Sequence, residues 1–243
     1  MTRRRFFAPP SAFNFNKRVV TLTSDEARHL REVLRLKAGD EVQVFDGAGR
    51  EFRAVVSQAR REFAELEIGD EIESPKAESP LQLTLAVALL KGEKFDLVVQ
   101  KGTELGVNRF IPLVTRYADI RLRDDGDAAK RVTRWQRIAL EAAKQCGRSF
   151  VPEISAPASF ESALSEGSCL MFSERDGEGL NTDLKTDNLT AIVGSEGGWS
   201  DEELDQARAA GVPIVTLGGR VLRAETAAIA TAVLLQHLYG DLK

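Results

Sequence analysis

Two loops of this chain contain the residue types that could bind a charged ligand and act on it. The first loop follows an apolar strand pattern, contains the run Gly194-Ser-Glu-Gly-Gly198, and leads into a helix pattern at Ser200. Glycines let a ligand approach the backbone closely, and Ser200 followed by Glu203 is typical of a helix capping box. Taken alone, such a glycine cluster is explained more simply as a tight turn that binds nothing.

The second loop, residues 216–226, also runs from a strand pattern through two glycines into a helix pattern. It carries Arg220, Arg223 and Glu225 at the loop and at the helix start. An arginine at such a position could stabilise negative charge that develops on a substrate, and a carboxylate could accept a proton. The simpler alternative is an Arg–Glu ion pair that only ties the loop down.

Several common catalytic and nucleotide-binding motifs are absent from the sequence. No P-loop pattern occurs, no GxGxxG follows a strand, and Ser195 lacks the glycine two residues earlier that a nucleophile elbow requires. His29 and His237 are the only histidines, and we predict a structural role for each. The cysteines, Cys146 and Cys169, are too few for a metal cluster or a disulfide framework. We therefore expect no metal site and a reducing, cytoplasmic location.

The elements that must position the two loops alternate between strand and helix patterns. Strands are predicted at 83–90, 110–114, 169–172, 191–193 and 214–217, and helices at 94–105, 128–146 and 224–239. Such alternation predicts an α/β domain with a mostly parallel sheet. Because these sheets bind ligands at the carboxyl ends of their strands, the loops after the last strands are the predicted site.

The first part of the chain has mainly short strand patterns. Strands are predicted at 41–45, 51–56 and 63–68, with a glycine-containing hairpin turn between the first two, and a helix is predicted at 24–36 with Ser24 as its cap. This pattern predicts a small β-barrel of about seventy residues. The polar segment 71–80 contains two prolines and is typical of a linker. We therefore divide the chain into residues 1–72 and 73–243.

The charge of the chain is distributed unevenly between these two parts. Residues 1–61 carry 13 Lys and Arg against seven Asp and Glu, although the whole chain has a net charge of −4. A basic module joined to an acidic one could hold a polyanion through phosphate contacts, although an unevenly charged solvated surface explains the pattern equally well. No apolar run is long enough to span a membrane, and the basic start lacks the apolar core of a secretory signal.

At several ordered segments the sequence resembles the RsmE-type rRNA uridine-N3 methyltransferases, which belong to the SPOUT superfamily. The resemblance covers nearly the whole chain and is far more specific than either loop alone. It is carried by 5–7, 29–36, Gly39-Asp40, Asp46-Gly47, 101–106, 135–141, Gln145-Cys146, Arg148, 194–198 and 217–227. Two positions depart from the family pattern, because Ser195 replaces the usual proline and Ala224 replaces a common threonine. The first departure could loosen the loop that holds the cofactor.

The resemblance implies a PUA-like, RNA-binding first domain and a SPOUT α/β domain whose C-terminal chain threads a trefoil knot. It also implies a homodimer with the site at the subunit interface. S-adenosylmethionine would lie in the knot, held largely by backbone groups, and would leave as S-adenosylhomocysteine. The cofactor-binding positions carried over are Phe172, Ser173, Gly194, Gly197, Leu217, Gly218 and Leu222.

The reaction implied is methylation of N3 of a specific uridine in 16S ribosomal RNA, so that the small ribosomal subunit or its RNA would be the partner. N3 carries a proton and must lose it to become a nucleophile. We predict that Arg223 stabilises the resulting charge and that Glu225 is the base or orients Arg223. The predicted RNA contacts are Arg3, Arg5, Arg18, Arg28, Arg31, Arg35 and Arg148.

Two other functions are compatible with the sequence. Another SPOUT RNA methyltransferase, for example one that methylates a ribose 2′-OH, would have loops with the same spacing. A non-catalytic ribosome-assembly factor that keeps the fold would bind RNA alone. The intact glycines of both loops, together with Arg223 and Glu225, argue against the second alternative. Cofactor binding distinguishes it from an enzyme.

Overall fold

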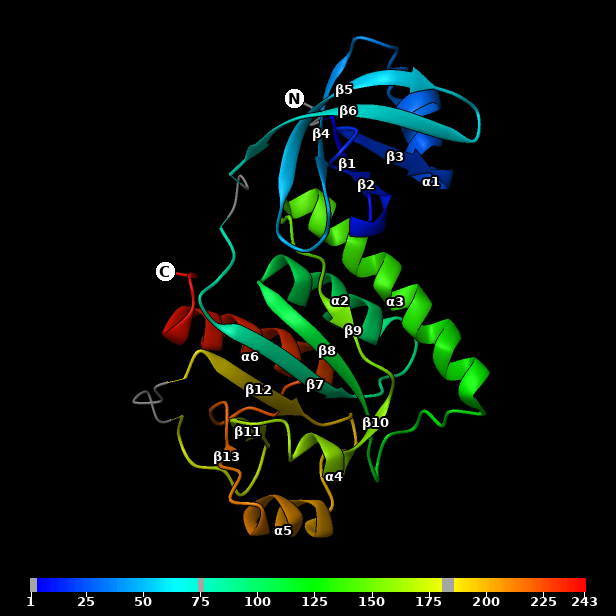
Figure 1. Ribbon diagram of the computed structural model, residues 1–243. Helices are drawn as coiled ribbons and strands as arrows, with labels where there is room; N and C mark the ends of the chain where they lie inside the picture. The colour runs from blue at the N-terminus through cyan, green and yellow to red at the C-terminus, as the bar shows by residue number, and fades with distance from the viewer. Residues whose placement is uncertain (1–3, 74–76, 181–185) are drawn as a thin grey trace. The chain divides into compact units, whose positions relative to one another are not determined.

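The structure is a computed structural model that describes residues 4–73, 77–180 and 186–243 (Figure 1). Its residues group into two units. The first unit consists of the described residues up to Glu78 together with Ala143–Val151, and the second consists of Ser79–Ala142 and Pro152–Lys243. The segment 143–151 thus groups with the N-terminal sheet. The functional division at residues 72 and 73 stays a prediction.

The first unit is built on a six-stranded sheet in the order β1-β4-β5-β6-β3-β2. Its strands are β1 (Arg5–Phe7), β2 (Phe13–Asn14), β3 (Val19–Thr23), β4 (Glu41–Phe45), β5 (Glu51–Ala59) and β6 (Phe63–Ile72), and the 3-10 helix η1 is Pro10–Ala12. The predicted hairpin is confirmed: β4 and β5 pair antiparallel, and the Asp46 carboxylate accepts hydrogen bonds from the backbone N–H groups of Ala48 and Arg50. The described edge strands β1 and β2 do not pair, so the sheet is a curled half-barrel rather than the closed barrel expected.

The helix predicted at 24–36 is shorter than expected and changes type. The α-helix α1 (Ser24–Arg28) continues as a single π-helical segment, η2 (His29–Val33). The cap position falls on Thr23, because β3 stays extended through that residue and Ser24 is already helical. The helix ends early because the backbone turns into the left-handed region at Arg35, whose φ is 53°.

The second unit is built on a seven-stranded sheet, in which all the described strand pairs are parallel. The order is β10-β8-β7-β12-β11-β13, with β9 also paired to β8. Its strands are β7 (Gln82–Ala88), β8 (Val107–Val114), β9 (Glu153–Ile154), β10 (Ala158–Ser159), β11 (Cys169–Phe172), β12 (Asn188–Val193) and β13 (Ile214–Val215). The parallel sheet predicted from the alternation of elements is therefore confirmed.

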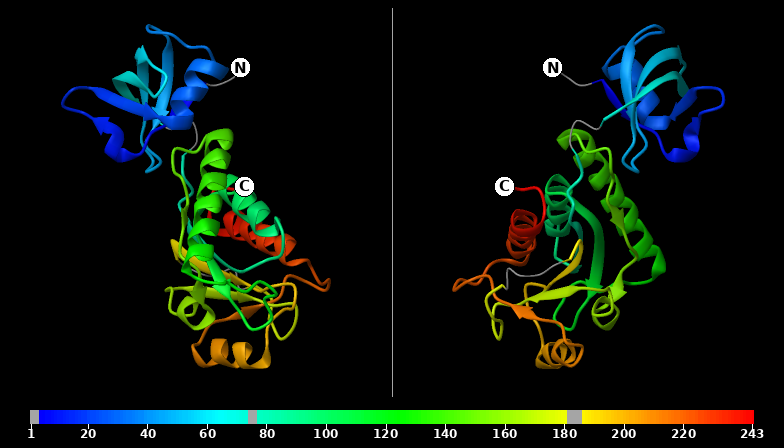
Figure 2. Two further views of the ribbon diagram at one scale, coloured as in Figure 1. Left: turned by 90° about the vertical axis from the view of Figure 1, so that its right-hand side faces the viewer. Right: turned by 60° about the vertical axis from the view of Figure 1, so that its left-hand side comes forward.

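Helices cover both faces of this sheet, which explains why its central strands are mostly apolar. The helices are α2 (Lys94–Glu104), α3 (Asp125–Cys146), α4 (Phe160–Ala163), α5 (Asp201–Ala209) and α6 (Ala224–Tyr239). Figure 2 shows α2 and α6 on one face and α5 on the other. Trp199, Leu204 and Phe160 pack with Ile111 and Met171 in the core of the α4 and α5 face. The long helix α3 starts earlier than predicted because the Asp124 carboxylate accepts a hydrogen bond from the backbone N–H of Asp127 at 2.8 Å.

Candidate active site

A pocket lies where β11, β12 and β13 end, and it contains about 490 Å³ of space continuous with solvent. Residues from three successive strand ends and from the start of α6 form its wall. Among them are six of the seven positions predicted to bind a cofactor, namely Phe172, Ser173, Gly194, Leu217, Gly218 and Leu222. The location agrees with the general rule for parallel α/β sheets.

The sheet register explains why these residues meet. Phe172 and Val193 are register partners on neighbouring parallel strands, so Ser173 and Gly194 leave the sheet side by side. The Ser173 backbone N–H donates to the carbonyl of Val215 at 2.9 Å, which brings the loop after the third strand to the same edge. The pocket therefore follows directly from strand order.

Trp199 and the capping box hold the first glycine loop in place. The indole N–H of buried Trp199 donates to the Phe172 carbonyl at 2.8 Å, and a Cβ on Gly194 would lie 3.1 Å from that ring. Ser200 and Glu203 exchange both hydrogen bonds of the predicted capping box. The second carboxylate oxygen of Glu203 accepts from the backbone N–H of Arg116 at 2.9 Å, so the box also fixes the loop after β8.

The pocket wall combines apolar side chains with one unsatisfied polar group. Phe172, Leu217 and Leu222 provide apolar surface, and the glycines expose backbone. The hydroxyl of Thr216 is buried in this wall and has no hydrogen-bond partner among the residues that the structure describes. A ligand with a flat apolar part and polar edges fits such a wall, because apolar side chains and the backbone groups of glycines line it together.

A second hollow adjoins the pocket and shares part of its wall, and it contains about 830 Å³ of space that is partly open solvent. Glu174, Ser195, Gly198, Leu222 and Ala224 line both spaces. The second hollow also contains Lys94, Glu196, Gly197, Val221 and Arg223. Gly197, predicted to bind the cofactor, thus lines the second hollow and not the pocket. Its backbone packs against Tyr117, since an added Cβ would lie 2.7 Å from the Cβ of that residue.

The two residues predicted to be catalytic occupy different environments. Arg223 is exposed at the start of α6, lines the second hollow, and makes no recorded side-chain hydrogen bond or ion pair within the described residues. Glu225 lines neither space. Its side chain is 12% exposed, and its buried Oε2 lies 3.6 Å from Lys94 Nζ without a hydrogen-bond partner in the described structure. The sequence prediction did not distinguish these environments.

Lys94 and Glu196 form a charged pair in the second hollow that the sequence analysis missed. Lys94 Nζ donates to Glu196 Oε1 at 2.7 Å, and this hydrogen bond is the main cause that raises the pKa of Lys94. Burial raises the pKa of Glu196, but its hydrogen bonds to Lys94 and to the backbone outweigh burial and lower the pKa. One signal was available: Lys94 begins α2 just after β7, at the same edge of the sheet as the glycine loops.

Four of the predicted RNA-contacting arginines lie at or near the surface of the first unit. Arg18, Arg28 and Arg35 are exposed, and Arg31 is partly exposed and paired with Glu32. Arg18 also lines an open groove together with Arg4 and Arg53. Arg3 lies outside the described residues.

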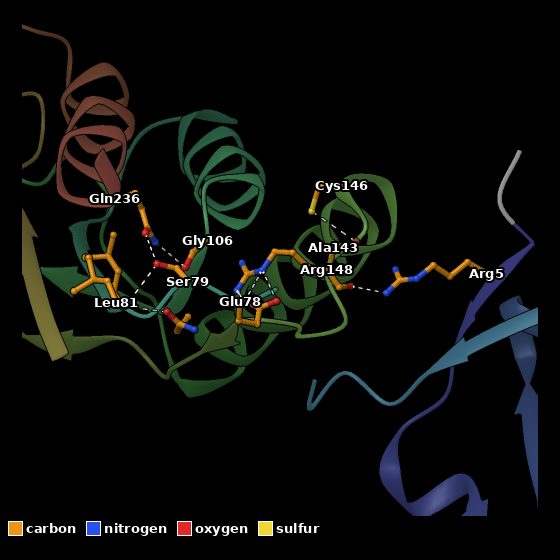
Figure 3. Close-up of polar contacts among 11 residues, drawn as sticks. Arg5, Glu78, Ser79, Leu81, Gly106, Ala143, Cys146, Arg148 and Gln236 are labelled. Atoms are coloured by element: carbon orange, nitrogen blue, oxygen red, sulfur yellow. Dashed lines mark hydrogen bonds and ion pairs between the residues drawn. The ribbon is translucent and has the colours of Figure 1, made fainter. Parts of the chain in front are cut away.

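The other two predicted RNA contacts, Arg5 and Arg148, are wrong for this structure because both are buried. Arg148 is 5% exposed and forms an ion pair with Glu78 at 2.6 Å. The side chain of Arg5 is 2% exposed, and it forms a two-point ion pair with Glu51 and donates to the Arg148 carbonyl (Figure 3). Both guanidinium groups therefore act within the unit and do not face a polyanion.

The described residues contain no group of three or more His, Cys, Asp or Glu side chains arranged to hold a metal ion. Among the helices that the structure describes, none combines the length and the apolar character needed to cross a bilayer.

Comparison with known proteins places this site in a family. A model described as "RNA methyltransferase domain" matches residues 77–236, and one described as "RNA methyltransferase PUA domain" matches residues 22–69. A ribosomal RNA small subunit methyltransferase E of Synechocystis is 37% identical over 86% of this chain and 69% of its own length.

Two solved structures share the fold of this chain over nearly its whole length. A Legionella pneumophila protein with bound cofactor SAM has a TM-score of 0.88 at 31% identity and covers both chains completely. The Neisseria gonorrhoeae ribosomal RNA small subunit methyltransferase E, bound to S-adenosyl methionine, has a TM-score of 0.86 at 35% identity and covers 99% of this chain and 100% of its own. With a family model that covers most of the chain and relatives that match both units, the chain belongs to the RNA methyltransferase family that includes the ribosomal RNA small subunit methyltransferase E proteins.

Proposed function

We propose that this protein transfers a methyl group from S-adenosylmethionine to N3 of a specific uridine in 16S ribosomal RNA. The observation that carries the proposal is the pocket at the ends of β11, β12 and β13, with Arg223 in the hollow beside it. Relatives named as small subunit rRNA methyltransferases, and two similar structures that hold the cofactor, support the reaction class.

The pocket has the features that S-adenosylmethionine requires. Apolar side chains such as Leu217 and Leu222 provide a surface for the adenine ring, and the backbone of the glycine loops offers hydrogen-bonding groups. When bound, the cofactor supplies an electrophilic methyl group.

The protein must then position the reactants and stabilise the charge that develops on the base. The pocket and the adjoining hollow must hold methyl donor and base in line, because positioning supplies a large part of the acceleration. The exposed guanidinium of Arg223 must stabilise the negative charge that spreads over O2 and O4 when N3 loses its proton. The target base leaves its stack to enter the hollow.

The path of the chain and its assembly are also part of the proposed function. We infer a trefoil knot in the segment from β12 to α6, where β13 returns to the far side of β11. We also infer a cytoplasmic homodimer with the site at its interface. Val221 at the edge of the second hollow is 81% exposed, and Leu97 on α2 and Val233 on α6 are also exposed, which supports burial of these helices by a second copy.

A methyl-transfer assay tests the proposed reaction. Purified protein, labelled S-adenosylmethionine and small ribosomal subunits from a strain that lacks the gene are combined, and the RNA is digested to nucleosides. Label in 3-methyluridine supports the enzyme, the cofactor and the atom together. Label in a 2′-O-methylated nucleoside would keep the methyltransferase and reject N3. No label, together with no detectable cofactor binding, would favour a ribosome-assembly factor.

Replacement of Arg31 and Arg35 by alanine is expected to weaken RNA binding and to lower its salt dependence. Each arginine that contacts a phosphate releases counterions, so the slope of log K against log salt should fall by roughly one per lost contact. Binding to a small-subunit RNA fragment, measured at several salt concentrations, provides the test. Arg208→Ala, an exposed position on α5 of the second unit, is the control. An unchanged slope in the double variant would remove these residues from the RNA interface.

Gly197→Ala is expected to weaken S-adenosylhomocysteine binding by about tenfold, since a shifted loop would lose contacts across the whole pocket wall. The added Cβ would lie 2.7 Å from Tyr117 Cβ and 3.0 Å from its carbonyl oxygen, so the loop that contains Gly194 and the segment at Tyr117 must move apart. Calorimetry measures the affinity. Gly179→Ala is the matched control, because a Cβ there meets no atom within 4 Å. Equal affinities for both variants would show that the pocket tolerates movement of this loop.

A further inference from the structure

The second hollow contains charged groups of both signs at its wall. Lys94 comes from the start of α2, Glu196 from the loop after β12, and Arg223 from the start of α6. Glu174, after β11, is the remaining charged residue of the wall. Four segments far apart in the sequence thus place two cations and two carboxylates around one space that adjoins the cofactor pocket.

This set of groups matches the Watson–Crick edge of uracil. That edge presents an acceptor at O4, a donor at N3–H and an acceptor at O2, and enzymes that extract a base from its stack read this edge. Lys94 and Arg223 have only donors, whereas the carboxylate of Glu196 has only acceptors. An ammonium group has three donors, so Lys94 can keep its 2.7 Å hydrogen bond to Glu196 and still donate to a base.

Resting on the function proposed above, we propose that the second hollow is the binding site for the target uracil. In this site Lys94 and Arg223 donate to its two carbonyl oxygens, and Glu196 accepts from N3–H. Cytosine would present an amino donor to a cation at one of these positions, and its N3 carries no proton. The same groups therefore select uracil and prepare it for reaction.

The chemistry follows from the position of the two cations. N3 passes its proton to the Glu196 carboxylate, which releases it to water, and the negative charge spreads onto O2 and O4. The N3 electron pair then forms a bond to the methyl carbon while the carbon–sulfur bond breaks. The electrons of that bond remain on sulfur, and the product is the thioether S-adenosylhomocysteine. Two cations next to O2 and O4 favour the anion and so lower the pKa of bound N3.

The environment of Glu225 explains its separate role. Glu225 does not line the hollow, and its carboxylate lies 3.6 Å from Lys94 Nζ. There it holds Lys94 together with Glu196 and keeps the ammonium charged. In this arrangement Glu225 positions Lys94, whereas the sequence predicted that Glu225 is the base or orients Arg223.

The acidic members of the wall argue against an RNA phosphate as the occupant. Glu174 and Glu196 balance the charges of Lys94 and Arg223, so the hollow has no net positive charge to hold a fixed anion. A neutral ring that becomes anionic only during the reaction suits a charge-balanced site. In the bound state its polar groups would all have hydrogen-bond partners, so none would be buried unpaired.

The test is the pH dependence of 3-methyluridine formation by wild type, Lys94→Met and Lys91→Met on unmodified small subunits, between about pH 6 and about pH 9.5. Removal of a cation next to an ionising group raises the pKa of that group, so the Lys94 variant should be at least about tenfold slower at pH 7. Its deficit should shrink as the pH rises, because solution pH then drives the ionisation. Lys91 is exposed and pairs with Asp119, so its variant should follow wild type.

S-adenosylhomocysteine affinity, measured on the same three proteins, should stay within about twofold, as for a residue outside the cofactor pocket. A wild-type rate and profile for Lys94→Met would overturn the inference, as would a deficit of constant size at every pH. Weaker S-adenosylhomocysteine binding would place Lys94 in the cofactor site instead, and weaker RNA binding with a lower salt slope would identify a phosphate contact. If wild type forms no 3-methyluridine at any pH, the proposed function fails rather than the role of Lys94.

Discussion

Arg223→Ala is expected to lower the rate of methyl transfer by about 10²- to 10³-fold, the loss typical of removing one donor to a developing oxyanion. The guanidinium lines the hollow beside the cofactor pocket and makes no recorded side-chain hydrogen bond or ion pair within the described chain. Its contribution to α6 comes from the backbone, where its carbonyl accepts from the N–H of Ala227 at 2.8 Å. Truncation of the side chain should therefore remove the stabilisation of the oxyanion and leave the fold intact.

Single-turnover rates and S-adenosylhomocysteine affinity together decide this prediction. The affinity should change by less than about twofold, because Arg223 lines the second hollow and not the cofactor pocket. Arg223→Lys is the matched variant, since it keeps the charge and loses the planar fork, and it should retain an intermediate rate. A normal rate for Arg223→Ala with normal cofactor binding would exclude Arg223 from the reaction.

Glu51→Gln is expected to lower the free energy of unfolding of the first unit by about 3–5 kcal/mol, the usual cost of leaving one buried charge without its partner. Glu51 is fully buried and accepts two hydrogen bonds from Arg5 at 2.9 Å and one from the Ser149 hydroxyl at 2.6 Å. Arg5 also lies over the ring of Phe45, 3.9 Å from its centroid. Neutralisation of Glu51 would leave the buried Arg5 charge without a counter-charge.

Glu71→Gln is the matched control for this effect. Glu71 forms a comparable two-point ion pair with Arg50, but about half of each side chain is exposed. Solvent screens such pairs, so the free energy of unfolding should change little. Urea unfolding followed by far-ultraviolet circular dichroism measures it. Similar losses of stability in the two variants would contradict a dominant role for burial of the Arg5–Glu51 pair.

Local sequence determined much of this protein. The alternation of apolar strands and helices was sufficient to predict a parallel sheet, because each pattern reflects contacts within one element and burial on both faces. The pairing of Ser200 with Glu203 predicted a capping box that the structure contains, since both partners lie within one helical turn. Glycine loops after successive strands also predicted that these loops would meet at one edge of the sheet, because parallel strands leave a sheet on the same side.

Only the tertiary structure decided which charged side chains face the site. Arg5 and Arg148 belong to a basic sequence pattern, yet long-range ion pairs with Glu51 and Glu78 bury them in the first unit. Lys94 and Glu196 are 102 positions apart and meet because β7 and β12 are neighbours in the sheet. Periodicity reports which face of an element is buried, but it carries no information on which distant partner a charge will meet. Strand order supplies that information, and it arises only when the whole chain folds.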